Sequence, residues 1–307
     1  MLLSASRRTD IPACFSDWFF NRLREGFVLV RNPYRHHQVR KLSLSPKVVD
    51  GIVFWTKNPA PMLDRLSLLG SIPYYFQFTL TPYDKVWEPG LPDKRNTLIP
   101  LFQRLAEQIG PDRVLWRYDP ILLDSRYTAQ AHLEAFGEFA DRLKGYTRCC
   151  TISFLDRYPG IHRTLEAMGA APPAPADCEA LAQGFSKIAR ACGIRLFSCA
   201  EELPLERYGI PHGRCVDSGL LGELGGIPLQ VERDQNQRPA CGCAASVDIG
   251  AYGTCSNGCR YCYANRGRGP AGGHNPQSPL LTGELGPEDV IKEKILQSCQ
   301  LDQQSLY

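Results

Sequence analysis

The stretch Tyr74-Tyr-Phe-Gln-Phe-Thr-Leu80 is an aromatic, apolar run of the kind that forms a buried strand. Comparable short runs recur along the chain, at residues 2–6, 51–56, 113–118, 151–155, 195–200 and 247–252. Between several of them apolar residues recur at helical spacing, within residues 98–109, 133–143 and 181–192. Strands that alternate with helices predict a parallel sheet with right-handed crossovers, and therefore an α/β fold.

The composition is that of an ordinary globular protein. Of 307 residues, 43% are hydrophobic and 22% charged, which is enough for a full core. The net charge of 35 − 32 = +3 excludes a strongly basic nucleic-acid-binding domain, although a local basic groove stays open. No apolar run is long enough to span a membrane, so we expect no membrane partner. The absence of a secretory signal, together with thirteen cysteines, predicts a cytoplasmic protein with reduced thiols.

Polar side chains follow the predicted strands, where a barrel collects its chemistry at one mouth. A cationic patch for a carboxylate or a phosphate could be formed by Arg7, Arg8, Lys57 and Arg117. We expect the catalytic residues to be Arg7, Lys57, Arg117 and Asp119, and we expect two further residues to bind cofactor, namely Thr79 and Glu201. The alternative is that such clusters are solvated loop starts or helix caps.

The densest cysteine group is the pattern Cys255-x-x-x-Cys259-x-x-Cys262. Three thiolates on a tight, Gly-containing loop can hold three irons of a 4Fe–4S cluster. The fourth iron then stays open, as a site needs if it binds a reactant directly. Zinc is the alternative, with His274 or an upstream cysteine as a fourth ligand.

Four further cysteines lie in or beside residues 203–246, a segment rich in Gly, Pro and polar residues that reads as an irregular insert: Cys199, Cys215, Cys241 and Cys243. An insert too polar to pack well needs a staple, and four thiolates could supply one by binding an auxiliary iron–sulfur cluster or a structural zinc. The other six cysteines are expected to be packing or surface residues, namely Cys14, Cys149, Cys150, Cys178, Cys192 and Cys299.

Three parts of one domain follow from these patterns. Residues 1–202 form the barrel body, 203–246 the cysteine-containing insert, and 247–307 a final strand, the cysteine loop and a C-terminal helix. That helix is predicted from about Pro287, with Glu288 and Asp289 in its first turn, where the helix dipole favours acidic side chains.

The string YGTCSNGCRYCYAN at 252–265 resembles the signature of radical S-adenosylmethionine enzymes, and it is especially similar to the spore photoproduct lyase-like branch. The whole chain also resembles a bacterial family, domain-of-unknown-function family 1848. Besides the cysteine string, the matching pieces are SASRRTDIPA (4–13), VFWTKNPAPML (53–63), YYFQFTLT (74–81), WRYDPIL (116–122) and CAEE (199–202).

The resemblance implies that Cys255, Cys259 and Cys262 bind a 4Fe–4S cluster and that Tyr261 contacts the adenine of S-adenosylmethionine. The amino and carboxylate groups of that cofactor would chelate the open iron. One electron, from a donor such as flavodoxin or ferredoxin, would then cleave the sulfonium to methionine and a 5′-deoxyadenosyl radical. The radical would abstract a hydrogen from a small molecule, a peptide or a nucleic acid.

The order of the parts departs from the resemblance. In most radical S-adenosylmethionine enzymes the cysteine loop follows the first barrel strand, whereas here it follows residues 247–252. The resemblance therefore implies a partial (β/α) TIM-like barrel that is circularly permuted, with residues 2–6 beside 247–252. Two alternative functions stay open: a nucleic-acid repair lyase of the spore photoproduct lyase type, and a non-catalytic, zinc-stabilised binding protein.

Overall fold

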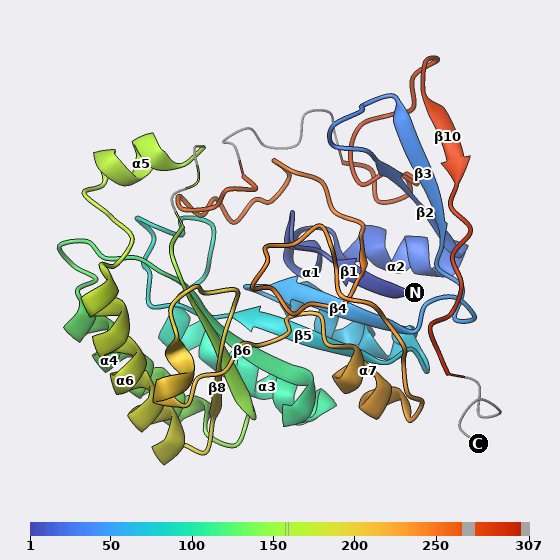
Figure 1. Cartoon of the computed structure of the whole chain (residues 1–307). Coiled ribbons are helices and arrows are strands. Elements are labelled where there is room, and N and C mark those ends of the chain that lie inside the picture. Colours follow the sequence, from blue (N-terminus) through green and yellow to red (C-terminus); the bar gives the residue numbers. More distant parts are fainter. Residues whose placement is uncertain (157, 159, 266–273, 302–307) are drawn as a thin grey trace.

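The computed structural model describes residues 1–156, 158, 160–265 and 274–301. Its centre is a seven-stranded sheet in the order β8-β7-β6-β5-β4-β1-β9, in which every neighbouring pair is parallel (Figure 1). The strands are β1 (Leu2–Ala5), β4 (Gly51–Thr56), β5 (Tyr74–Thr79), β6 (Val114–Ile121), β7 (Cys149–Phe154), β8 (Arg195–Ser198) and β9 (Val247–Asp248). All seven predicted strands and the α/β fold class are therefore confirmed.

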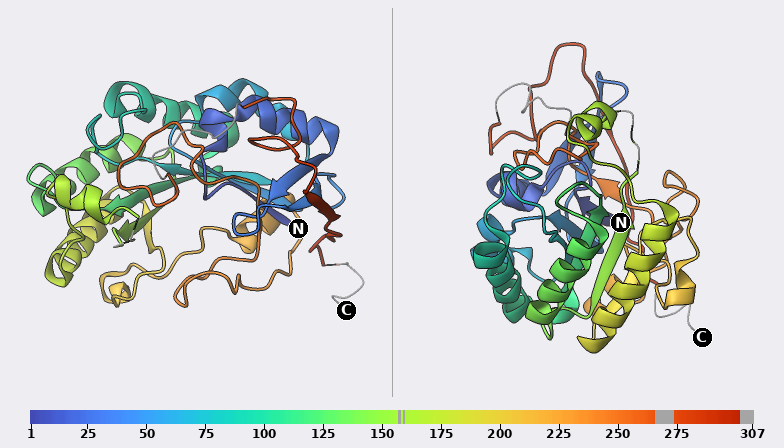
Figure 2. Two further views of the ribbon diagram at one scale, coloured as in Figure 1. Left: turned by 90° about the horizontal axis from the view of Figure 1, so that it is seen from above. Right: turned by 90° about the vertical axis from the view of Figure 1, so that its left-hand side faces the viewer.

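Helices cover one face of this sheet, and residues 203–246 run over the other (Figure 2). The covering helices are α1 (Ile11–Cys14), α2 (Ser16–Glu25), α3 (Ile99–Ile109), α4 (Ala129–Leu143) and α6 (Pro175–Ala191). On the second face the insert contributes η4 (Leu205–Tyr208) and α7 (Ser218–Gly225). Leu221 of α7 packs directly over Gly51 of β4, where a side chain would collide with it.

Side-chain alternation along the strands explains why they are apolar throughout. Phe54 and Phe76 point into the core beneath the helices, whereas Val53 and Tyr75 point toward the insert. A strand buried on both faces needs apolar residues at consecutive positions, and this is the pattern of the stretch at 74–80.

The sheet is open, because β8 and β9 form its two edges in the part of the chain that the structure describes. The prediction that residues 2–6 lie beside residues 247–252 is confirmed, because Leu3 pairs with Val247 and Ser4 with Asp248. β9 is shorter than the predicted run to residue 252, because beyond Ser4 the segment after β1 donates its hydrogen bonds to the Asp248 carboxylate instead of to a strand backbone. That carboxylate accepts from Ser6 Oγ at 2.6 Å and from the Arg7 amide at 2.8 Å.

The predicted C-terminal helix is wrong. Residues Val290–Glu293 form β10, which pairs in parallel with β3 (Gln38–Ser43) in a second sheet that also holds β2 (Phe27–Arg31). Asp289 does not serve a helix dipole, because its carboxylate binds the Arg31 guanidinium at 2.6 and 2.7 Å. The β-branched pair Val290-Ile291 then continues as a strand along β3.

The remaining elements are short connections: η1 (Ala60–Leu69), the π-helical turn η2 (Lys94–Leu98), η3 (Pro111–Arg113) and α5 (His162–Ala167). Among the described residues, no helix has the length and apolar character needed to cross a membrane.

Candidate functional site

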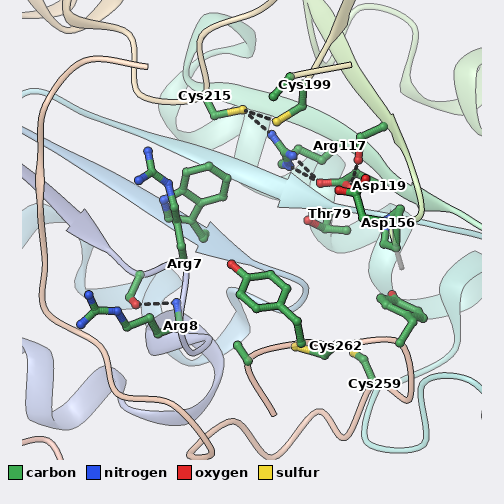
Figure 3. Close-up of a pocket in the computed structure, with 18 of the residues that line it drawn as sticks. Arg7, Arg8, Thr79, Arg117, Asp119, Asp156, Cys199, Cys215, Cys259 and Cys262 are labelled. Carbon is green, nitrogen blue, oxygen red and sulfur yellow. Dashed lines mark hydrogen bonds and ion pairs between the residues drawn. The ribbon is translucent and has the colours of Figure 1, made fainter. Parts of the chain in front are cut away.

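A cavity of about 490 Å³ opens where the carboxyl ends of the sheet strands meet the cysteine loop, and small-molecule sites commonly have volumes of about 300–1,000 Å³. Seven cysteines line it, namely Cys199, Cys215, Cys241, Cys243, Cys255, Cys259 and Cys262. So do six other predicted site residues, Arg7, Lys57, Thr79, Arg117, Asp119 and Tyr261. Figure 3 shows Cys259 and Cys262 across the cavity from Cys199 and Cys215.

Contacts on both sides fix the cysteine loop. Asn257 Nδ2 donates to the buried Asp10 carboxylate at 2.9 Å, which ties the loop to the segment after β1. On the other side the Gly90 amide donates to the Asn257 carbonyl at 3.0 Å. A Cβ at residue 90 would lie 2.5 Å from the Ser256 carbonyl oxygen, so only glycine permits this close approach. Gly258 supplies the left-handed turn, with φ +66°.

The thirteen cysteines are all free thiols. Cys14, expected to be a packing or surface residue, lies beside the Cys255 thiol, and its own sulfur is 3.2 Å from Ser256 Oγ. No group of three or more His, Cys, Asp or Glu side chains is arranged to hold a metal ion as the described residues stand. His274 does not line the cavity: its ring packs on Phe15, and its Nδ1 is 3.0 Å from the Leu281 carbonyl oxygen.

A buried carboxylate, Glu88, organises the base of the loop. Lys57 Nζ lies 2.8 Å from Glu88 Oε1, and Lys94 and the Tyr261 hydroxyl also donate to this carboxylate. Burial alone would raise the Glu88 pKa, but the two ammonium groups outweigh it and lower that pKa to about 2. Burial likewise lowers the Lys57 pKa, yet Glu88 and the nearby Cys259 thiol raise it overall. Lys57 is thus held charged beside the cysteine loop.

Tyr261, which the resemblance assigns to adenine, is largely buried among aromatic side chains. Its ring packs against Tyr83 and Trp87, at centroid distances of 5.5 and 6.3 Å, and its side chain is 6% exposed. Lys57 Nζ sits 5.5 Å from the ring centroid. Tyr261 thereby couples the cysteine loop to the Glu88 network, while one part of it still lines the cavity.

On the other side of the cavity, Arg117 links β6 to the second cysteine group, which comprises Cys199, Cys215, Cys241 and Cys243. Its Nη1 donates to Cys215 Sγ at 2.8 Å, and its Nε donates to Asp119 at 3.1 Å. Ser153 Oγ also donates to Asp119. Burial would raise the Asp119 pKa, but Arg117 and this hydrogen bond lower it. Burial would similarly lower the Arg117 pKa, whereas Cys215 and Asp119 raise it, so both groups are charged.

Two guanidinium groups lie against the ring of Trp55 in β4. The Cζ atom of Arg7 is 5.3 Å and that of Arg117 is 5.1 Å from the ring centroid. Arg7 makes only a long ion pair, 3.8 Å to Asp234, and its buried Nη2 has no hydrogen-bond partner among the described residues. A buried donor without a partner is uncommon and costly. Arg7 is therefore available for an acceptor in the cavity.

Glu201 is the one predicted site residue that does not line the cavity. Its carboxylate accepts from the Phe154 amide at 2.9 Å and thereby caps the end of β7. Burial, reinforced by the nearby Asp156 and Asp119, raises the Glu201 pKa to about 7.

Several residues of the site were not expected from the sequence. Glu88 and Trp55 carry no pattern that separates them from ordinary loop and strand residues, and Arg238 lies in the irregular insert. Asp10 carries a visible signal, because it follows the first predicted strand and is a residue type that commonly caps helices. It does cap α1, accepting from the Ala13 amide at 3.0 Å, and it holds the cysteine loop as well.

Comparisons with known proteins place the chain in a family without assigning a reaction. No curated protein and no solved structure matches it. The family described as Domain of unknown function (DUF1848) matches residues 2–264. Because this match spans most of the 307 residues, the chain belongs to the DUF1848 family.

Proposed function

We propose that this protein is a radical S-adenosylmethionine enzyme whose 4Fe–4S cluster is held by Cys255, Cys259 and Cys262. One observation carries the proposal: these three cysteines line the same cavity as the polar side chains at the strand ends. Three thiols on one loop, a cavity of small-molecule size and charged groups around it are the parts that such chemistry requires.

The three loop thiols do not enclose an ion as they stand, but a three-thiolate cluster requires only that their side chains change rotamer. The loop is held at Asn257 and Gly90, so its thiols have a fixed relation to the cavity. Burial raises the pKa of the Cys259 thiol to about 12, and the positive charge of Lys57 beside it acts in the opposite direction. When bound, the cluster and S-adenosylmethionine would supply reductive cleavage of the sulfonium, and a donor such as flavodoxin or ferredoxin would supply the electron.

The chain's own groups would bind and orient the reactants. Arg7 has a free donor nitrogen for a carboxylate or a phosphate. Thr79 places a hydroxyl at the end of β5, and Tyr261 presents part of its ring to the cavity beside the cysteines. Asp119 is held as a carboxylate by Arg117 and Ser153, so it can accept a hydrogen bond from a substrate hydroxyl or amine. The substrate class stays open between a small molecule, a peptide and a nucleic acid.

The sheet supports a permuted partial barrel as the finer description of the fold. If β9 is counted as the first strand, the remaining strands β1, β4, β5, β6, β7 and β8 follow one another across the sheet in chain order. The cysteine loop then follows the first strand, as the resemblance requires.

Removal of the three loop thiols tests the proposal. The variant Cys255→Ala, Cys259→Ala, Cys262→Ala, purified without oxygen, should contain about four fewer irons per chain than the wild type, because a cube does not persist without its thiolates. The matched control replaces three cysteines that do not line the cavity, Cys178, Cys192 and Cys299, with Ala. Equal iron in the loop variant and the control would refute the assignment.

A further inference from the structure

We propose a second metal centre in the wall of the same cavity, bound by Cys199, Cys215, Cys241 and Cys243 and offset in charge by Arg7 and Arg117. Its ligand chemistry is four thiolates, which suit zinc or an iron–sulfur cluster. This goes beyond the proposed function, because cleavage of S-adenosylmethionine does not require a second metal centre.

The four thiols form a connected group although they come from distant parts of the chain. The Cys199 and Cys215 sulfurs are 3.5 Å apart, and the Cys243 thiol is a neighbour of those of Cys215 and Cys241 in one buried cluster. Thiolates on one tetrahedral zinc lie roughly 3.5–4 Å apart at the usual zinc–sulfur length. The thiols as they stand do not enclose an ion, so binding requires cysteine side chains to change rotamer, which involves one torsion each.

The surroundings of the sulfurs are those of metal-bound thiolates. Cys215, Cys241 and Cys243 are 2%, 8% and 3% exposed, and they pack with apolar residues of the insert and the sheet. Two donors point at the sulfurs: the Val216 amide at 3.4 Å from Cys243, and Arg117 Nη1 at 2.8 Å from Cys215. Donors around thiolate ligands orient them and tune the metal.

Charge gives an independent reason. Four thiolates around a divalent ion leave a net charge of about −2, which a low-dielectric site must offset. Arg7 and Arg117 both lie against the Trp55 ring, and Figure 3 shows the Arg117 guanidinium beside Cys199 and Cys215. Asp119 already pairs with Arg117, whereas Arg7 makes only a long ion pair, 3.8 Å to Asp234. An anionic centre at the four thiols would offset the charge of Arg7, whose Nη2 stays available to a reactant in the cavity.

The proposed centre lies in the wall of the cavity, so it is not a metal site that only stabilises a distant part of the fold. All four cysteines line the cavity that also receives Cys255, Cys259 and Cys262. A metal there would join the end of β8 to both ends of the insert, and it would also form part of the wall that a substrate contacts.

The experiment measures metal in the variant that lacks Cys255, Cys259 and Cys262, so that the loop cannot contribute. We expect this variant, purified without oxygen, to retain either about one zinc or an iron–sulfur cluster per chain. Elemental analysis with labile sulfide separates the two. X-ray absorption at the edge of the retained metal should show sulfur ligands at about 2.3 Å. Further replacement of Cys241 and Cys243 with Ala should abolish the retained metal.

Thiol alkylation keeps the test decisive if those added substitutions unfold the chain. In the wild-type protein, Cys199, Cys215, Cys241 and Cys243 should resist iodoacetamide until a strong chelator is added, whereas Cys192 should react at the same rate throughout. Absence of bound metal in the loop variant, together with chelator-independent alkylation of the four thiols, would overturn the second centre. Cofactor cleavage by the wild type is measured separately, so failure of either proposal can be recognised without the other.

The counter-ion role of Arg7 is tested by the rate of metal loss to a chelator. Loss of a group that supports metal ligands typically weakens binding about 10–100-fold, and we expect Arg7→Gln to lose the retained metal about tenfold faster. Arg7→Lys should restore most of the difference. Arg8→Gln is the matched control, since Arg8 lies against the Tyr252 ring, 5.3 Å from its centroid. Equal rates for Arg7→Gln and Arg8→Gln would remove Arg7 from the centre.

Discussion

At the scale of single residues, Glu88 has the largest predicted effect on stability. Its carboxylate holds two lysines and the Tyr261 hydroxyl in a buried position. Removing one partner of a buried ion pair leaves charge without compensation and typically costs about 3–5 kcal/mol.

We therefore expect Glu88→Gln to lower the free energy of unfolding by about 3 kcal/mol or more, as measured by urea unfolding followed by circular dichroism. Glu138→Gln is the matched control, because Glu138 pairs with Arg95 at a solvent-exposed position and such pairs contribute at most about 1 kcal/mol. Equal losses in the two variants would show that the buried Glu88 network stabilises the fold no more than an exposed ion pair does.

Glu201 makes the free energy of unfolding depend on pH with the sign opposite to that of a typical paired carboxylate. Its folded-state pKa of about 7 lies above the ordinary value of 4.5, so the folded chain binds more protons between these two pH values. This residue's contribution to stability is therefore fully present below pH 4.5 and is lost as pH rises through about 7.

Glu201→Gln should remove that loss while Gln Oε1 still accepts from the Phe154 amide. Between pH 5 and pH 8, the variant should gain roughly 2–3 kcal/mol in unfolding free energy relative to the wild type. The exposed neighbour Glu202 supplies the control, as Glu202→Gln. A pH profile of Glu201→Gln parallel to that of the wild type would contradict the raised pKa.

The sequence predicts residues of the site where they follow strands or share a spacing pattern. Arg7, Lys57 and Arg117 reach the cavity for that reason, because parallel strands direct their carboxyl ends to one edge. Glu201 follows a strand too, but the chain turns after β8 and directs its carboxylate to the Phe154 amide. Glu88 lies in a loop whose path depends on long-range contacts, so no local pattern indicates it.

At the scale of elements, the cysteine loop depends on a glycine more than 160 residues away in the chain. The backbone of the loop rests on Gly90, and an added Cβ would meet two carbonyl oxygens, at 2.5 Å from Ser256 and 2.8 Å from Asn257. Backbone atoms cannot rotate out of the way, so the loop itself would have to move.

Gly90→Ala should therefore reduce the iron bound at the cysteine loop and the yield of 5′-deoxyadenosine, because the three thiols lose their fixed spacing. Gly137→Ala in α4 is the control, since its Cβ would meet only Ile188 Cδ1, at 3.9 Å, and helical alanine is favoured by roughly 0.5–1 kcal/mol. Iron analysis and cofactor cleavage are measured on both variants. Unchanged iron and cleavage in Gly90→Ala would show that the loop position does not matter.

Local signals predicted the central sheet but misassigned β10. Its preceding residues, Pro287, Glu288 and Asp289, have the composition of a helix start. The structure places Asp289 against Arg31 and pairs Val290 with Gln38, about 250 residues away. A pairing between such distant segments leaves no periodic signal in either one, and all four side chains of β10 are exposed.

At the scale of the whole molecule, different parts of the chain cover the two faces of the sheet. The helices bury one face, and residues 203–246 bury the other with the cysteines of the second group. The composition of that insert predicted an irregular path and a need for a staple. It did not predict that the insert covers the sheet and forms the cavity wall, because that placement rests on contacts such as Leu221 over Gly51.

Chain order and spatial order also differ at this scale. β9, which comes last in the sheet by sequence, lies beside β1 and brings the cysteine loop to the ends of the strands formed by residues 2–198. The spacing of the cysteines and the edge position of β9 together support radical chemistry at this cavity.

The formation of 5′-deoxyadenosine tests that chemistry most directly. Anaerobically purified protein, reconstituted with iron and sulfide, is given S-adenosylmethionine and dithionite, and the products are analysed by mass spectrometry. We expect 5′-deoxyadenosine from the wild type and none from the variant lacking Cys255, Cys259 and Cys262. Iron-loaded wild type that forms no more 5′-deoxyadenosine than that variant, or a colourless protein that binds only zinc, would contradict the proposed function.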